Sequence, residues 1–206
     1  MKTRGAWGSS CQYGDCLTLD GIDDYLTVAD PGGPYSIGVG ESVTISAWVK
    51  RTDEIGTNTI LKRVSNINLG NYMLDAQNAS GGIGPRFRYT NTTPANQVWT
   101  GTESDGTDPN EWHHYVIIHA FHNTTPVTAG YLDGASTGGS WTTGKGIGTP
   151  DESAITNLCI GADCGTVDQY FLNGSIDDLT LWNKSLSQDE ITTLAAPNKL
   201  SVSLDN

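Results

Sequence analysis

The sequence has few basic residues, no long apolar run and none of the short motifs that mark common enzyme classes. Its 206 residues include 11 Lys and Arg against 23 Asp and Glu, a formal net charge of −12. So acidic a surface repels phosphate backbones, which excludes nucleic acid as an expected partner. No apolar stretch approaches the roughly 20 residues of a membrane-spanning helix, so we expect no membrane insertion.

Motifs for catalysis are also missing. The sequence contains no Gly-x-Ser-x-Gly turn, no P-loop and no His-Glu-x-x-His zinc motif. No closely spaced carboxylates lie on one strand face, the arrangement that would suit glycoside hydrolysis. The acidic residues cluster in turns instead. We therefore expect a protein that is not an enzyme.

The four cysteines form two pairs with the same C-x4-C spacing, Cys11 with Cys16 and Cys159 with Cys164. Four cysteines allow three connectivities, and spacing alone does not choose among them. We expect two local disulfides, which would imply an oxidising compartment and hence an extracellular or cell-surface protein. A four-thiolate zinc site is the alternative, although structural zinc usually has a tighter spacing in one pair.

Short alternating segments dominate the chain. In Ser42–Lys50, for example, Val43, Ile45, Ala47 and Val49 face one way, which predicts a strand with one face in a core. Turn residues separate many such segments, and one helix is expected late, where Ser187 and Glu190 form a capping box and Leu186 and Ile191 a hydrophobic staple. The pattern predicts an all-β, antiparallel two-sheet sandwich with one short C-terminal helix. Asp133-Gly134 predicts a type I′ hairpin turn.

Two acidic elements are candidates for a metal site. Asp20-Gly21-Ile22-Asp23-Asp24 is a glycine-containing turn with three carboxylates, and hard cations such as calcium prefer clustered oxygens in a bent loop. A solvated turn in which aspartate caps the backbone explains the same residues. Asp177 and Asp178 lie in a predicted strand, where they should point to opposite faces.

Aromatic and histidine side chains offer a second kind of candidate. Sugars stack on aromatic rings, and Trp99 and Trp141 lie in polar, turn-rich segments where core burial is less certain; Tyr89, Tyr131 and Tyr170 belong to the same set. Each ring could instead close a loop onto the sandwich. The adjacent histidines of 113–114 diverge in a strand, so packing in the sheet is a better interpretation than zinc binding.

Several motifs in a fixed order resemble the laminin G-like, concanavalin A-like jelly-roll domains of prokaryotic surface or secreted proteins. The resemblance covers about residues 16–194. The matching segments are Leu19–Leu26 (LDGIDDYL), Ser46–Lys50 (SAWVK), Glu111–Tyr115 (EWHHY), Tyr131–Gly134 (YLDG), Tyr170–Leu179 (YFLNGSIDDL) and Leu186–Ile191 (LSQDEI).

The resemblance implies a jelly roll whose first and last strands are close, which would bring the Asp20–Asp24 turn near Asp177. Members often hold a structural calcium, so the ligands expected here are Asp20, Asp23, Asp24 and Asp177. The family's glucanase relatives use catalytic carboxylates that have no counterpart in this sequence. We expect residues 1–15 to be an N-terminal extension, 16–196 the domain, and 197–206 a tail or linker.

These observations lead to a functional hypothesis. The protein is expected to be a non-catalytic carbohydrate-binding or adhesion module with a structural Ca²⁺, part of a larger multidomain chain, whose ligand is a glycan or cell-surface molecule. Ligand contacts are expected from Trp99, Trp141 and Tyr89. A protein-binding or structural module is the alternative, followed by a glycoside hydrolase or polysaccharide lyase.

Overall fold

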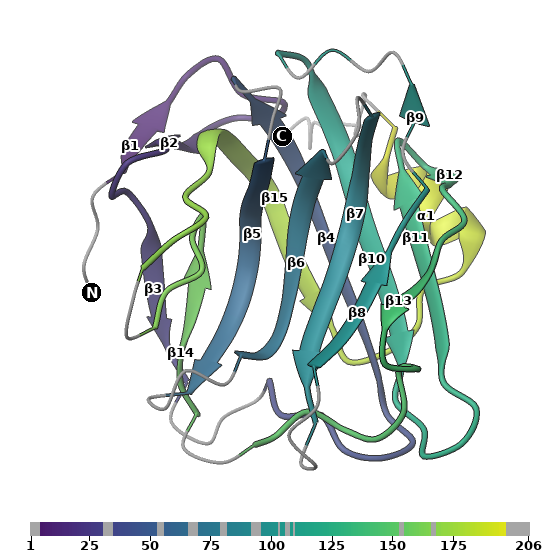
Figure 1. Cartoon of the computed structure of the whole chain (residues 1–206). Helices are drawn as coiled ribbons and strands as arrows, with labels where there is room; N and C mark the ends of the chain where they lie inside the picture. Colours follow the sequence, from purple (N-terminus) through teal and green to yellow (C-terminus); the bar gives the residue numbers. More distant parts are fainter. Residues whose placement is uncertain are drawn as a thin grey trace, which may run out of the picture.

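The computed structural model shows a sandwich of two antiparallel β-sheets with one helix at its side (Figure 1). The fold class predicted from the sequence is therefore confirmed. The structure describes residues 5–30, 35–52, 56–65, 70–78, 82–91, 96–102, 104–105, 108, 110–152, 155–165 and 168–196. The predicted tail of 197–206 lies outside this part of the chain.

The first sheet has seven strands and contains both ends of the domain. Its order is β1-β2-β15-β4-β10-β11-β12, so the last strand of the chain is inserted between two early ones. The strands are β1 (Ala6–Gly8), β2 (Cys16–Asp20), β15 (Asn173–Trp182), β4 (Ser42–Arg51), β10 (Trp112–Ala120), β11 (Val127–Leu132) and β12 (Ala135–Ser136).

The second sheet has eight strands and faces the viewer in Figure 1. Seven follow the order β13-β8-β7-β6-β5-β14-β3, and β9 pairs with β7 off this path. They are β13 (Ser140–Thr143), β8 (Asn96–Thr100), β7 (Gly82–Thr90), β6 (Gly70–Asn78), β5 (Gly56–Ser65), β14 (Ile155–Ile160), β3 (Leu26–Ala29) and β9 (Ser104–Asp105).

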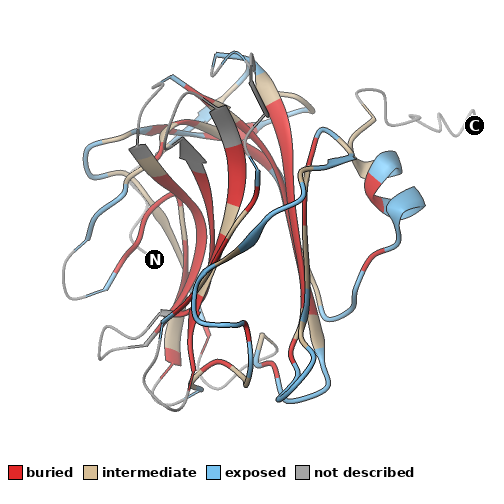
Figure 2. Ribbon diagram, turned by 45° about the vertical axis from the view of Figure 1, so that its right-hand side comes forward, coloured by how far each residue is buried: buried red, intermediate tan, exposed pale blue. Residues whose placement is uncertain are grey.

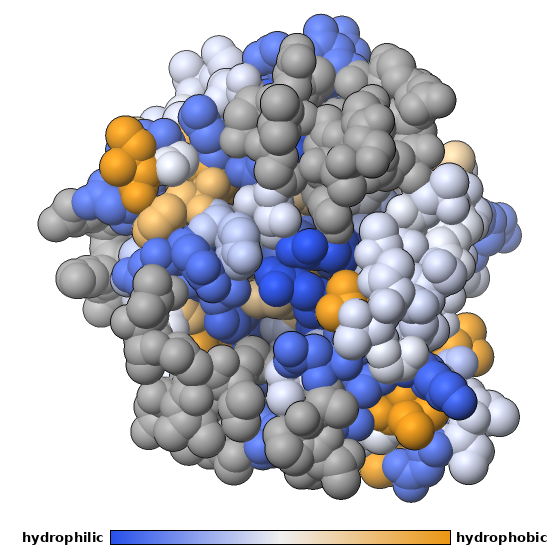
Figure 3. Space-filling model, in the orientation of Figure 1, coloured by the Kyte–Doolittle hydropathy of each residue, from blue (hydrophilic) through white to orange (hydrophobic). Residues whose placement is uncertain are grey.

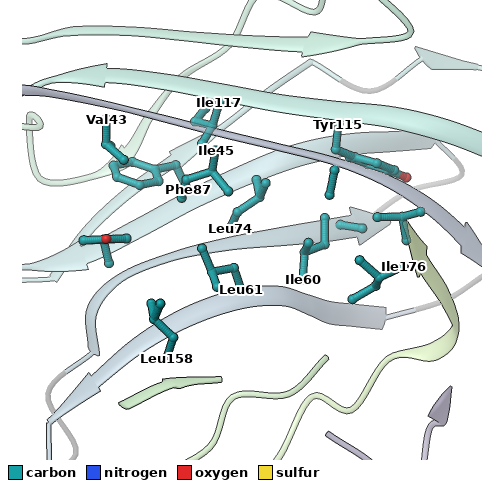
Figure 4. Packing of buried hydrophobic residues seen from close by; sticks show 14 of the residues in the cluster. Val43, Ile45, Ile60, Leu61, Leu74, Phe87, Tyr115, Ile117, Leu158 and Ile176 are labelled. Carbon is teal, nitrogen blue, oxygen red and sulfur yellow. The ribbon is translucent and has the colours of Figure 1, made fainter. Parts of the chain in front are cut away.

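The core lies between the two sheets, where the inward residues of each strand meet. Val43 and Ile45 of β4 and Ile117 of β10 project from the first sheet toward Leu74 and Phe87 of the second (Figure 4). The alternation predicted for β4 places these residues inward, as expected for strands with one buried face. The outward face of β4 is also covered, because Thr44, Ser46 and Trp48 are buried beneath the C-terminal segment.

Helix α1 (Gln188–Leu194) covers the outer face of the seven-stranded sheet (Figure 2). The predicted capping box is present: the Ser187 hydroxyl accepts from the Glu190 amide, and the Glu190 carboxylate accepts from the Ser187 amide. Leu186 and Ile191 are both buried in a small apolar cluster with Val116 and Ile118 of β10. The helix start predicted from the sequence is confirmed.

Two further sequence features determine local geometry. Asp133 and Gly134 both have positive φ angles, 52° and 80°, and join β11 to β12, as a type I′ turn requires. The expected N-terminal extension of residues 1–15 contains β1, which pairs with β2. The structure has disulfides Cys11–Cys16 and Cys159–Cys164, so both pairs are local. Within the described residues, the helix is too short and polar to cross a membrane.

Candidate functional site

The acidic turn after β2 brings three carboxylates together. One oxygen from each of Asp20, Asp23 and Asp24 lies within 4.8 Å of the others, a spacing that a shared calcium ion with ligand distances near 2.4 Å can bridge. Asp20 is exposed and its Oδ1 accepts from the amides of Ile22 and Asp23. These bonds, chiefly that from Ile22, hold the pKa of Asp20 below its usual value. The donor set therefore fits a hard cation in both chemistry and spacing.

Asp177 is not part of this cluster. In the pairing of β15 with β2, Asn173 lies opposite Asp20, whereas Asp177 lies opposite Trp48 of β4. Four residues of strand separate the two positions, about 13 Å. The buried Asp177 carboxylate accepts from the amides of Tyr13 and Asp178 at 2.7 Å each. The first and last strands are adjacent as expected, but their register directs Asp177 to the N-terminal segment rather than to the acidic turn.

A β-bulge explains the paired aspartates. The register of β15 against β4 shifts between Asp177 and Thr180, and Asp178 has a φ of 49°. A bulge inserts an extra residue and re-aims its neighbours. Asp177 lies with Trp48 on the outward face of the sheet, where its carboxylate accepts from the Tyr13 amide, and Asp178 faces solvent.

The aromatic residues expected to bind sugar are mostly core residues. Trp99 and Tyr89 are 3% and 2% exposed and pack between the sheets, so neither presents a ring face to solvent. Tyr89 also donates its hydroxyl to the Ile147 carbonyl. Trp141 is half-buried against the same core. The expectation failed for Trp99 because β8, a strand not predicted from the sequence, places Gln97 and Trp99 on its inner face.

The histidines of β10 also have structural environments. His113 donates its Nδ1–H to the Asp133 carboxylate across the hairpin, and this interaction raises its pKa. His114 contacts the Ser46 hydroxyl and the Trp48 ring. His119 lies between the sheets, and burial lowers its pKa to about 3. The predicted packing of these side chains in the sheet agrees with these positions.

A polar hollow lies on the outer face of the eight-stranded sheet. Figure 3 shows hydrophilic residues gathered there, over the middle of β5 to β8. The hollow has a volume of about 160 Å³, and we call it the outer-face hollow. Its lining residues are Lys62, Met73, Arg88, Tyr89, Thr90, Asn96, Gln97, Val98 and Asp163.

Strand register builds the floor of this hollow. Lys62 of β5 lies opposite Met73 of β6, Met73 lies opposite Arg88 of β7, and Arg88 lies opposite Val98 of β8. Side chains directly opposite each other on antiparallel strands share one face. One row across four strands therefore places two cations, separated by a methionine, on the outer face of the sheet.

Asp75 anchors the arginines of this face from below. It has no exposed surface, and its carboxylate accepts from Thr59, Arg86 and Arg88 at 2.8–3.0 Å. Burial opposes its ionisation, but the guanidinium groups of Arg88 and Arg86 outweigh this effect and keep its pKa below the usual value. The ion cluster thus fixes both arginine side chains in place.

The loop between β14 and β15 forms one wall of the hollow. Lys62 forms an ion pair with Asp163, which neighbours the disulfide residue Cys164. Tyr170 lies over Arg88, with the guanidinium carbon 5.7 Å from the ring centroid, and remains 42% exposed. An aromatic ring, cations and amide groups therefore meet at one solvent-accessible place.

Among these residues, only Tyr170 and Tyr89 could be expected from the sequence as contacts for a ligand. The alternation Arg86-Phe87-Arg88-Tyr89 is visible in the sequence and predicts two arginines on one strand face. Whether these arginines lie close to Asp75 and Lys62 depends on the register of three strands. A bulge in β5 between Thr59 and Leu61 changes that register. Local sequence does not specify such a shift.

Comparisons with solved structures find the same fold in other proteins. The chain is similar to the SAP-like pentraxin of Limulus polyphemus, with a TM-score of 0.60, 16% identity and coverage of 87% of this chain and 80% of that one. Domain 4 of AbnA, a GH43 extracellular arabinanase from Geobacillus stearothermophilus in complex with arabinotriose, is similar with a TM-score of 0.59 and 16% identity. The match covers 95% of this chain and 82% of that one. The CBM40 of the Ruminococcus gnavus IT-sialidase, bound to α2,3-sialyllactose, is similar with a TM-score of 0.55 and 16% identity. The match covers 77% of this chain and 84% of that one.

At these identities the likeness concerns the fold alone. A search of curated protein sequences finds no match. A family model, in contrast, matches residues 20–192, which is most of the domain. By this match the chain belongs to the concanavalin A-like lectin/glucanase superfamily, as a laminin G-like domain.

Proposed function

We propose that this protein is a non-catalytic, extracellular carbohydrate-binding module whose ligand occupies the outer-face hollow. The observation that carries the proposal is the exposed Tyr170 ring held over Arg88 beside a polar hollow. Sugar rings stack on aromatic side chains, and their hydroxyls accept from fixed cationic and amide donors. Structural neighbours include an arabinotriose complex and a sialyllactose complex, which supports binding of glycan by a protein of this fold.

The carboxylates at the hollow support a role without catalysis. A general acid for glycoside hydrolysis needs a carboxyl group that holds its proton near neutral pH. Asp75 is fully buried among arginines that lower its pKa, and Asp163 is paired with Lys62. Within the described residues of the hollow, neither carboxylate is arranged to donate a proton to a glycosidic oxygen. The two disulfides further support secretion into an oxidising compartment.

Glycan binding is tested by titration calorimetry of the whole chain against arabinan, xylan, pectin and sialylated oligosaccharides, with calcium present. Tyr170→Ala should weaken binding about tenfold, because a stacked aromatic ring contributes on the order of 1–2 kcal/mol. Trp7→Ala is the matched control, since Trp7 is 72% exposed on β1 of the other sheet. If Trp7→Ala weakens binding and Tyr170→Ala does not, the ligand binds elsewhere; turnover of any polysaccharide would contradict the non-catalytic role.

We further propose that Asp20, Asp23 and Asp24 hold a structural calcium. An ion that binds only the folded state stabilises it by about 2.7 kcal/mol at 100 times its dissociation constant. Thermal melting in calcium and in EGTA should therefore give different midpoints. Asp20→Asn should abolish this difference, and Asp15→Asn, an exposed carboxylate in the preceding loop, should keep it. Identical wild-type melts in both solutions would contradict the metal site.

A further inference from the structure

The outer-face hollow has an excess of positive charge in a strongly acidic protein. The ion cluster at and beside it contains three cations, Lys62, Arg86 and Arg88, and two carboxylates, Asp75 and Asp163. The net charge of this cluster is +1, whereas the whole chain has a net charge of −12. The rest of the surface repels anions, so an anionic ligand is directed to this place.

Within the described part of the chain, Arg86 and Arg88 do not use all of their hydrogen-bond donors. Asp75 accepts from the Nε of each arginine and from Nη2, and no hydrogen bond within the described residues uses the Nη1 group of either Arg86 or Arg88. Their side chains are 14% and 23% exposed. Because the buried carboxylate already fixes both guanidinium groups, little side-chain entropy remains to be lost when a ligand binds.

The surroundings of these donors suit a sugar rather than a free ion. Tyr170 presents a ring beside Arg88, and Asn96 and Thr90 add neutral polar groups to the lining. The volume of about 160 Å³ equals that of several water molecules, too large for one small anion to fill. A saccharide that carries its charge on a ring substituent would use both the cations and the polar lining.

We infer that the outer-face hollow selects acidic glycans, in which a carboxylate or sulfate group of the sugar accepts hydrogen bonds from Arg88 and Arg86 while the sugar ring packs against Tyr170. This inference rests on the proposed function and specifies its ligand class. Charge-assisted hydrogen bonds are stronger than neutral ones, and they account for a preference of about 10- to 100-fold over an uncharged counterpart.

The test is calorimetric titration of the full chain with matched pairs in which one member carries acidic groups that the other lacks. The pairs are 3′-sialyllactose with lactose, oligogalacturonate with its methyl ester, and chondroitin sulfate with desulfated chondroitin oligosaccharide. The expected result is that at least one acidic member binds about 10- to 100-fold more tightly than its partner, and that salt reduces the difference. The pair that shows the preference distinguishes a carboxylate from a sulfate.

Variants distinguish binding by the two arginines of the hollow from attraction by the positive charge of the protein in general. Arg88→Gln and Arg86→Gln should each remove most of the preference, and Arg88→Lys should keep part of it because the charge remains. Lys184→Gln, which removes an exposed cation paired with Glu190 beside α1, is the matched control and should bind as the wild type does. Thermal unfolding of each variant checks that loss of preference is not loss of folding.

Three results overturn the inference, and they differ in what they say about the proposed function. If the two members of every pair bind equally, the protein remains a carbohydrate-binding module, but the hollow does not select charge. If no pair binds, both the proposed function and the inference fail. A preference that persists in both glutamine variants also overturns the assignment to these arginines.

Discussion

Lowering the pH from 7 to 5 should destabilise the protein through His119, whose imidazole is fully buried between the two sheets. Its Nδ1 contacts the Thr128 hydroxyl at 2.8 Å, and its Nε2 has no hydrogen bond within the described residues. The rings of Phe121, Tyr89 and Phe87 surround it at centroid distances of 4.3–5.4 Å. Burial lowers its pKa to about 3, although the nearby Gly146 carbonyl acts in the opposite direction.

The sign and size follow from linkage. In the unfolded chain the imidazole has a pKa of about 6.5, so it is almost wholly protonated at pH 5, whereas the folded protein keeps it neutral. Protons therefore bind the unfolded state more tightly, and stability falls as the pH drops below 6.5 toward 3. The difference in pKa corresponds to a loss of about 2 kcal/mol between pH 7 and pH 5. With a typical urea dependence of about 2 kcal/mol per molar, the unfolding midpoint should fall by about 1 M.

The assay compares urea unfolding of the wild type and His119→Gln at the two pH values. Glutamine can still bond to Thr128 but does not titrate, so the variant should lose about 2 kcal/mol less than the wild type between pH 7 and pH 5. His113 provides a control of opposite sign: its hydrogen bond with Asp133 raises its pKa, so it contributes stability below pH 6.5 that is lost at higher pH. His113→Asn should therefore steepen the loss in acid. An unchanged acid dependence in His119→Gln would refute the reasoning.

Two further predictions concern local structure and are read by urea unfolding. Ser187→Ala removes the capping box of α1 and should lower the free energy of unfolding by about 1 kcal/mol. The control is Ser185→Ala, at an exposed serine just before the helix, which should change stability by less than about 0.5 kcal/mol. Equal effects of the two substitutions would exclude the cap as the cause. Gly174→Ala should cost at least about 3 kcal/mol, because Gly174 has a φ of 152° and an added Cβ would collide with the Lys50 carbonyl oxygen. The control is Gly14→Ala, because Gly14 has a φ of 50° but no other atom lies within 4 Å of an added Cβ, and it should cost about 1 kcal/mol of stability. A similar loss in both variants would mean that backbone conformation, and not the collision, is responsible.

Much of the fold could be predicted because its strands and turns have local signals. The alternation in β4 and the capping box at Ser187 each specify one element without reference to the rest of the chain. β8 has only five residues, and its sequence Asn-Gln-Val-Trp-Thr contains a buried glutamine on the core face, so it lacks a clear apolar alternation. Gln97 is buried there because its side-chain oxygen accepts from the amides of Lys145 and Gly146.

The candidate site was less predictable for the same reason. Asp75 alternates with the core residue Leu74, and Arg88 alternates with Phe87, so each looks like an ordinary outward residue of a strand. Only the pairing of β5, β6 and β7 shows that these charges converge. In contrast, the acidic turn at Asp20 could be identified because all of its carboxylates come from five consecutive residues.

The position of β15 has a consequence for how the chain folds. β15 lies between β2 and β4, so until residue 182 has been synthesised both of these early strands have an unpaired edge. Exposed strand edges on an incomplete sheet invite pairing between chains. Contacts between strands so distant in sequence also form slowly. A nascent chain that stalls before β15 should therefore aggregate rather than persist as a partial domain, and the two halves of the sheet become one cooperative unit only when translation of the domain is almost complete.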